Sequence, residues 1–213
     1  MTFTRNKGSY DAGSLDASAT FNILSSNFRA YNINFRNTYG TQGQAVAVTA
    51  NGDKQGYYAC GFYGYQDTLY AKSGRQYYSN CYIEGAVDFI FGAAAAWFGE
   101  CTVASNGGGY ITASSRGTTA DDVWYVFDHS TVSSLIIHNL STPVPADSVI
   151  VKVAKEFVPL RPQIRAAAGI NLAGKVFLGR PWRVLARIIF QNSELTNVVH
   201  PEGWTTMATG ATP

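Results

Sequence analysis

The feature that most constrains the fold of this chain is a repeat of about twenty residues. Its marks are Cys60, Cys81 and Cys101, which fall at nearly equal spacing. Aromatic residues precede each cysteine, and another large residue follows two positions later. Short runs of this kind at a fixed period are typical of a solenoid, in which every repeat adds one coil. Segments 28–35, 124–132 and 176–190 have the character of further coils. We therefore predict an all-β stack of coils.

The three cysteines should form a ladder inside the stack. Equivalent residues of stacked parallel strands lie about 4.8 Å apart, so their side chains lie above one another. This separation permits a disulfide, but an odd number of cysteines without C-x-x-C spacing fits neither a closed disulfide set nor a zinc site. We predict buried free thiols that act as small apolar fillers.

Length and composition indicate one domain covering residues 1–213. Segment 139–176 contains four prolines and a cluster of basic residues, so we predict a loop insertion there. The hydrophobic content of 46% is enough to fill a continuous core. A net charge of +2 with scattered basic residues argues against nucleic acid as a partner. No apolar run approaches the roughly 18 residues of a membrane span, and the first residues lack a signal-peptide pattern.

Two pairs of polar residues are separated by one repeat. Asp67 and Asp88 form one pair, and Gln44 and Gln66 form the other. Because residues one repeat apart are neighbours in a solenoid, we expect two carboxyls and two amides to converge. Two close carboxylates repel, which keeps one protonated while the other is ionised and so separates an acid from a nucleophile. Paired amides could stabilise an oxyanion, and Arg180 could hold one carboxylate through two hydrogen bonds.

Simpler structural roles are available to the same residues. Aspartate is common in turns, where its side chain bonds to the local backbone. On spacing alone, a turn role and a catalytic role for Asp67 and Asp88 are about equally good interpretations. The glutamines would more often be surface residues, and Arg180 would more often belong to a surface salt bridge.

Five ordered blocks resemble the signature segments of pectin methylesterases, particularly those of fungi. They are QAVA at 44–47, GYQDTLY at 64–70, YIEGAVDFIFG at 82–92, ITASSR at 111–116 and LGRPW at 178–182. The resemblance implies a right-handed, single-stranded parallel β-helix. Because catalytic domains of this family extend beyond both ends of this chain, we expect a fragment that lacks the N-terminal coils and their cap.

The resemblance also implies a reaction, hydrolysis of the C6 methyl ester of galacturonate in pectin with release of methanol. Asp88 then matches the nucleophile, Asp67 the general acid and base, and Arg180 the residue that orients Asp88. Gln44 and Gln66 match the oxyanion stabilisers. Four aromatic residues match positions that stack on sugar rings, namely Tyr70, Phe91, Trp182 and Trp204.

The family resemblance further implies an enzyme that needs no cofactor or metal, is secreted outside the cell, and binds pectin as a monomer when full length. It implies no nucleic-acid or membrane partner. Two other functions remain open at this point. One is a polygalacturonase-like glycoside hydrolase, in which two carboxylates flank a glycosidic bond at roughly 6.5–9.5 Å if the mechanism is inverting. The other is an inactive β-helix fragment that binds pectin through its aromatic groove.

Overall fold

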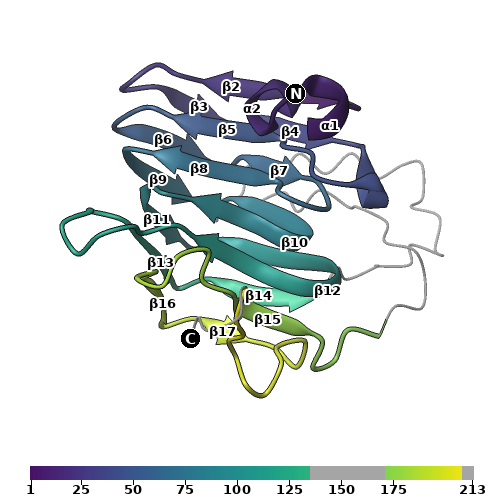
Figure 1. The fold of residues 1–213 in the computed structure, drawn as a ribbon, viewed down its shortest axis with the longest axis vertical. Helices are drawn as coiled ribbons and strands as arrows, with labels where there is room; N and C mark the ends of the chain where they lie inside the picture. The colour runs from purple at the N-terminus through teal and green to yellow at the C-terminus, as the bar shows by residue number, and fades with distance from the viewer. Residues whose placement is uncertain (135–170, 208–213) are drawn as a thin grey trace, which may run out of the picture.

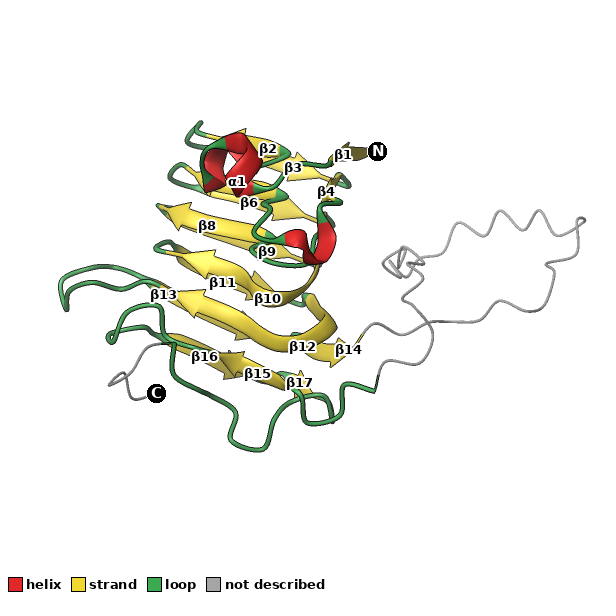
Figure 2. Ribbon diagram, turned by 45° about the vertical axis from the view of Figure 1, so that its right-hand side comes forward, coloured by secondary structure: helices red, strands yellow, loops and turns green. Residues whose placement is uncertain are grey.

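In the computed structural model, residues 1–134 and 171–207 are described, and they form a stack of parallel strands with two short helices near the N-terminus (Figure 1). Every pair of strands in the two sheets is parallel. Figure 2 shows the strands as the rungs of a ladder whose long axis runs from the N-terminal coil to the last strands. This arrangement confirms the predicted β-helix.

One sheet has six strands, in the order β16-β13-β11-β9-β6-β3. Its members are β3 (Arg29–Tyr31), β6 (Gln55–Tyr58), β9 (Arg75–Ser79), β11 (Ala95–Gly99), β13 (Trp124–Asp128) and β16 (Ile188–Gln191). The other sheet has eleven strands: β1 (Thr2–Arg5), β2 (Phe21–Ile23), β4 (Asn34–Asn37), β5 (Val48–Asn51), β7 (Gly61–Tyr63), β8 (Leu69–Ser73), β10 (Tyr82–Gly92), β12 (Thr102–Ser114), β14 (Thr131–Ser134), β15 (Val176–Gly179) and β17 (Glu194–Leu195). The helical segments are α1 (Ser9–Ala12), α2 (Leu15–Ser18) and the 3₁₀ turn η1 (Gly40–Gln42).

Each coil passes from the six-stranded sheet to the eleven-stranded sheet at a residue with positive φ. These residues are Asn32, Ala59, Asn80, Glu100, His129 and Asn192, with φ between 48° and 55°. Asparagine tolerates this left-handed conformation better than most residues, which explains its frequency at the bend. The structure thereby shows that the run around each cysteine is divided between two strands. The cysteine follows the bend, so a strand of the six-stranded sheet precedes it and a strand of the eleven-stranded sheet follows.

A column of stacked aromatic rings fills the core. Ring centroids are 4.9 Å apart for Tyr57 and Tyr78, 4.7 Å for Tyr78 and Phe98, 4.5 Å for Phe98 and Phe127, and 4.4 Å for Phe127 and Phe190. These spacings match the rise between neighbouring strands. Each coil therefore places one ring on the ring of the coil before it, which sets the register along the stack.

The cysteine ladder is present as predicted. Cys60, Cys81 and Cys101 are buried free thiols, and the backbone amides of Tyr82 and Thr102 bond to the carbonyls of Cys60 and Cys81. The thiols therefore pack between coils without a covalent link.

The predicted insertion at 139–176 lies outside the described residues up to position 170. The chain is described again from Asn171, and β15 begins at Val176 and pairs with β12. The ladder therefore resumes where the sequence repeat resumes. Within residues 1–134 and 171–207, no helix has the length and apolar character needed to cross a membrane.

Candidate active site

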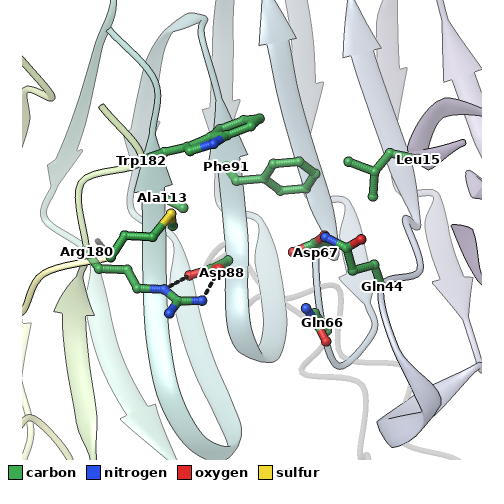
Figure 3. Close-up of a pocket in the computed structure, with 10 residues that line it drawn as sticks. Leu15, Gln44, Gln66, Asp67, Asp88, Phe91, Ala113, Arg180 and Trp182 are labelled. Atoms are coloured by element: carbon green, nitrogen blue, oxygen red, sulfur yellow. Dashed lines mark hydrogen bonds and ion pairs between the residues drawn. The ribbon is translucent and has the colours of Figure 1, made fainter. Parts of the chain in front are cut away.

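A pocket of about 260 Å³ opens on the outer face of the eleven-stranded sheet (Figure 3). One side of it is polar and the other is apolar. The polar residues are Gln44, Gln66, Asp67, Asp88 and Arg180, and the apolar ones are Leu15, Phe91, Ala113, Trp182 and Met207. The structure therefore brings together the two pairs that the repeat spacing predicted and Arg180, which was suggested as a partner for one carboxylate.

The two carboxylates come from adjacent coils. Asp67 lies between β7 and β8, and its backbone N–H donates to the carbonyl of Val87, immediately before Asp88. Asp88 lies within β10, where the register with β12 shifts between Val87 and Ile90. Such bulges bend a strand and redirect its side chains, and they are common beside active sites. The bulge turns Asp88 toward the pocket.

Arg180 holds Asp88 through a bidentate ion pair. Its Nε donates to Oδ1 of Asp88 at 2.9 Å, and its terminal nitrogen donates to Oδ2 at 2.7 Å. The arginine is fixed in turn by its backbone N–H, which donates to Thr112 O at 3.0 Å. Gly179 permits this approach, because an added Cβ there would lie 2.0 Å from the Thr112 hydroxyl. Paired bonds of this kind orient a carboxylate and hold it charged.

Asp67 has the opposite electrostatic environment. It is 3% exposed, and burial, followed by the charge of Asp88, raises its pKa to about 7. The Gln44 amide and the charge of Arg180 oppose this shift in pKa. Because a buried carboxyl without a cationic partner favours its neutral form, Asp67 can hold a proton under mildly acidic conditions.

Gln44 and Gln66 reach the same pocket from successive coils. The backbone N–H of Ala45 donates to Gln66 O at 3.1 Å, and Gln66 forms a β-bridge with Val87. The side chains of both glutamines line the pocket beside Asp67 (Figure 3). The arrangement places amide groups next to the carboxylate pair.

Two of the four predicted aromatic residues line the pocket. The ring centroids of Phe91 and Trp182 lie 6.2 Å apart, and Trp182 is 43% exposed. Tyr70 does not line the pocket but stacks on Phe91 at 4.3 Å, so it extends the aromatic surface by one coil.

Trp204 lies away from the pocket, against our expectation. It forms a β-bridge with Gly179, packs against the main core, and its ring is 6.2 Å from that of Phe190. The chain turns at Gly203, whose φ is 69°, and this turn directs Trp204 to the closing end of the core.

Sequence reasoning missed three apolar residues of the pocket. Leu15 is the first residue of α2, and Met207 is the last described residue of the C-terminal segment. Neither belongs to the repeat, so no spacing in the sequence marks them. Ala113 lies in the ITASSR block and is the register partner of Phe91 in the pairing of β10 with β12. It could therefore have been predicted from the repeat.

The metal-binding residue types do not gather in the described part of the chain. Across residues 1–134 and 171–207, no group of three or more His, Cys, Asp or Glu side chains is placed to hold a metal ion.

The fold and the site together place the chain in the class of parallel β-helix proteins that carry two carboxylates and an arginine on the outer face. Comparison with known families then assigns the chain. The pectinesterase family model matches residues 2–143 and 160–212, and the chain belongs to this family. The match breaks inside the predicted insertion.

Similar proteins agree with this assignment. Pectinesterase A of Emericella nidulans is 53% identical over the whole chain, and the pectinesterase of Aspergillus aculeatus is 40% identical over 98% of it. The crystal structure of the pectin methylesterase from Aspergillus niger covers all of the chain with a TM-score of 0.83 and 50% identity, and the chain covers 60% of that structure. The carrot pectin methylesterase gives a TM-score of 0.77 at 28% identity, with 99% of this chain and 59% of that structure covered. The chain spans 56% of the length of each of the two curated relatives.

Proposed function

We propose that this chain is a carboxylic ester hydrolase that removes methyl esters from the C6 carboxyl of galacturonate in pectin. The observation that carries this proposal is the unequal environment of the two aspartates. Asp88 is paired with Arg180 through two hydrogen bonds, whereas burial and the charge of Asp88 raise the pKa of Asp67 to about 7. One carboxylate is therefore suited to attack, and the other is suited to donate a proton.

In the first step, an Asp88 carboxylate oxygen attacks the ester carbonyl carbon. The carbonyl oxygen becomes an oxyanion that accepts hydrogen bonds from the amides of Gln44 and Gln66. Collapse of this intermediate breaks the bond to the methoxy oxygen, which takes the proton of Asp67 and leaves as methanol. The product is an anhydride between the galacturonate carboxyl and Asp88.

In the second step, water hydrolyses this anhydride. Asp67, now ionised, takes a proton from the water, whose oxygen attacks the acyl carbon. The bond to Asp88 breaks, which frees the Asp88 carboxylate and a galacturonic acid carboxyl, and this carboxyl loses its remaining proton to solvent as the product leaves. Asp67 ends the cycle protonated, as it began.

The apolar side of the pocket is suited to the sugar chain. Phe91 and Trp182 present aromatic surface beside the carboxylates, and Tyr70 continues it. Aromatic faces of this kind pack well on sugar rings, which have one apolar face. We propose that pectin is the partner of this surface and that the protein acts outside the cell as a monomer.

The test compares two products on methylated pectin. We expect methanol release without new reducing ends, and Asp88→Asn should lower methanol release by at least about three orders of magnitude because no nucleophile remains. Binding of pectin, measured by co-sedimentation, should change little, since asparagine keeps the shape of the side chain. Asp122→Asn is the matched control, because Asp122 is exposed outside the pocket.

Three outcomes would contradict the proposal. Reducing ends without methanol would indicate a glycoside hydrolase, and pectin binding without either product would indicate a binding module. Full turnover by Asp88→Asn would remove Asp88 from the nucleophile role.

A further inference from the structure

Arg180 has an aromatic neighbour that lies outside the pocket. The guanidinium carbon of Arg180 is 4.1 Å from the centroid of the Tyr110 ring. The other two contacts of this kind among the described residues are longer, at 5.0 Å between Arg36 and Tyr63 and 5.5 Å between Lys72 and Tyr70. At 4.1 Å, the cation is well within the range in which a ring face attracts it.

The edge and the face of the guanidinium have different partners. The edge formed by Nε and one terminal nitrogen binds Asp88, as Figure 3 shows. The contact with Tyr110 is made through a ring face and uses no N–H donor, so the two interactions do not compete. A bidentate pair needs the guanidinium close to the plane of the carboxylate. A ring packed on the guanidinium restricts its rotation away from that plane.

Tyr110 is itself supported by other rings. Its ring stacks on Phe177 at 5.8 Å, and Phe177 stacks on His200 at 4.2 Å. Tyr110 and Phe177 are register partners in β12 and β15, so the stack crosses adjacent coils. Gly109 lets the backbone approach the preceding coil, because an added Cβ there would lie 2.4 Å from Ala86 O. The Tyr110 ring is therefore supported by the Phe177 ring, and the backbone beside it is held close to the preceding coil.

We propose that Tyr110 is a positioning residue that holds the Arg180 guanidinium in the plane required for its bidentate bond to Asp88. This inference rests on the proposed function. Tyr110 acts through Arg180, and its hydroxyl group has no part in this role. The aromatic face is the required feature, so phenylalanine should replace tyrosine and an aliphatic residue should not.

The kinetic test uses Tyr110→Leu and Tyr110→Phe in the whole chain, with methanol release from methylated pectin as the assay. Tyr110→Leu should lower kcat by about tenfold, in keeping with the strength of a partly desolvated cation–π contact, and leave KM within about twofold. Tyr110→Phe should keep kcat within about twofold of the parent. Tyr77→Leu is the matched control, since it removes a half-exposed tyrosine from the six-stranded sheet and should leave both constants unchanged.

A second measurement does not depend on activity. In urea unfolding, Tyr110→Leu and Arg180→Met should each lower the midpoint, and the double variant should fall short of the sum because the two residues lose one shared contact. If the parent chain releases no methanol, the proposed function fails while this cycle still tests the contact.

Each of the following results would overturn the inference. If the midpoint changes of Tyr110→Leu and Arg180→Met add up to that of the double variant, the two residues are uncoupled. An unchanged kcat in Tyr110→Leu would show that the ring does not affect the reaction. An equal loss in Tyr110→Phe would assign the effect to the hydroxyl, and a rise in KM alone would make Tyr110 a substrate contact.

Discussion

Asp67 and Asp88 both adopt the left-handed backbone conformation, with φ angles of 64° and 48°. Aspartate is among the few residues that enter this region at modest cost. A left-handed backbone conformation, which turns favour, is therefore compatible with the catalytic role proposed for both residues. The backbone conformation that a turn favours is also the one that brings both side chains into the pocket.

The raised pKa of Asp67 predicts how stability depends on pH. Its ordinary value is 3.8 and its value in the folded protein is about 7, so the folded state binds this proton more tightly than the unfolded state. The part of the free energy of unfolding that Asp67 contributes should therefore be largest at low pH, fall as pH rises from about 4 to about 7, and then level. The contribution of Asp67 is on the order of 4 kcal/mol at most.

Urea unfolding at pH 4.5 and 7.5 measures this dependence, and Asp67→Asn should reduce it. Glu84 must be tested alongside, because burial also raises its pKa to about 7. Glu84→Gln should remove a separate part of the pH dependence of the free energy of unfolding, since Glu84 does not line the pocket. A slope that both single variants leave intact would show that neither carboxyl is protonated in the folded protein.

At the scale of one element, the bend between the two sheets requires a residue with positive φ, and the residues at this position differ in how well they tolerate it. Asn32, Asn80 and Asn192 suit their positive φ angles, whereas Ala59 has a φ of 51° at the equivalent position. A residue with a Cβ and no local hydrogen-bonding group carries the steric cost of this region without compensation. Ala59 is therefore a weak point of its coil.

Ala59→Asn should raise the free energy of unfolding by about 0.5–1 kcal/mol, because asparagine is better tolerated in this conformation. Chemical denaturation at constant pH measures the change. Ala59→Val is the opposing variant, and it should destabilise because a β-branched residue is strained at positive φ. Stabilisation by valine, or none by asparagine, would mean that side-chain packing rather than backbone conformation governs the bend.

For the whole molecule, the reactivity of the three buried thiols shows whether neighbouring coils of the stack separate. The three thiols lie between coils and are at most 2% exposed, so a reagent reaches them only when the coils separate. We expect no rapid reaction with a thiol-specific chromogenic reagent in the native protein, and three reactive thiols in denaturant. A thiol that reacts quickly under native conditions would show that its coil opens locally.

The repeat in the sequence was sufficient to predict the stack of coils, the ladder of thiols and the meeting of Asp67 with Asp88. In a solenoid, residues one repeat apart are spatial neighbours, so spacing along the chain carries three-dimensional information. Family resemblance then added roles to Gln44, Gln66 and Arg180. The period could not show that the run around each cysteine is divided between two strands, because a bend at one residue changes the direction of the chain without changing the period.

Only the tertiary structure decided which side chains complete the pocket. The contact between Arg180 and Asp88, which spans 92 residues of chain, was implied by the family resemblance. Leu15 and Met207, in contrast, reach the pocket from segments outside the repeat. Trp204, by contrast, turns into the end of the core. These positions depend on how non-repeating segments fold back on the stack. No period links such segments to their neighbours, so their contacts are set by packing in three dimensions and leave no regular trace in the sequence.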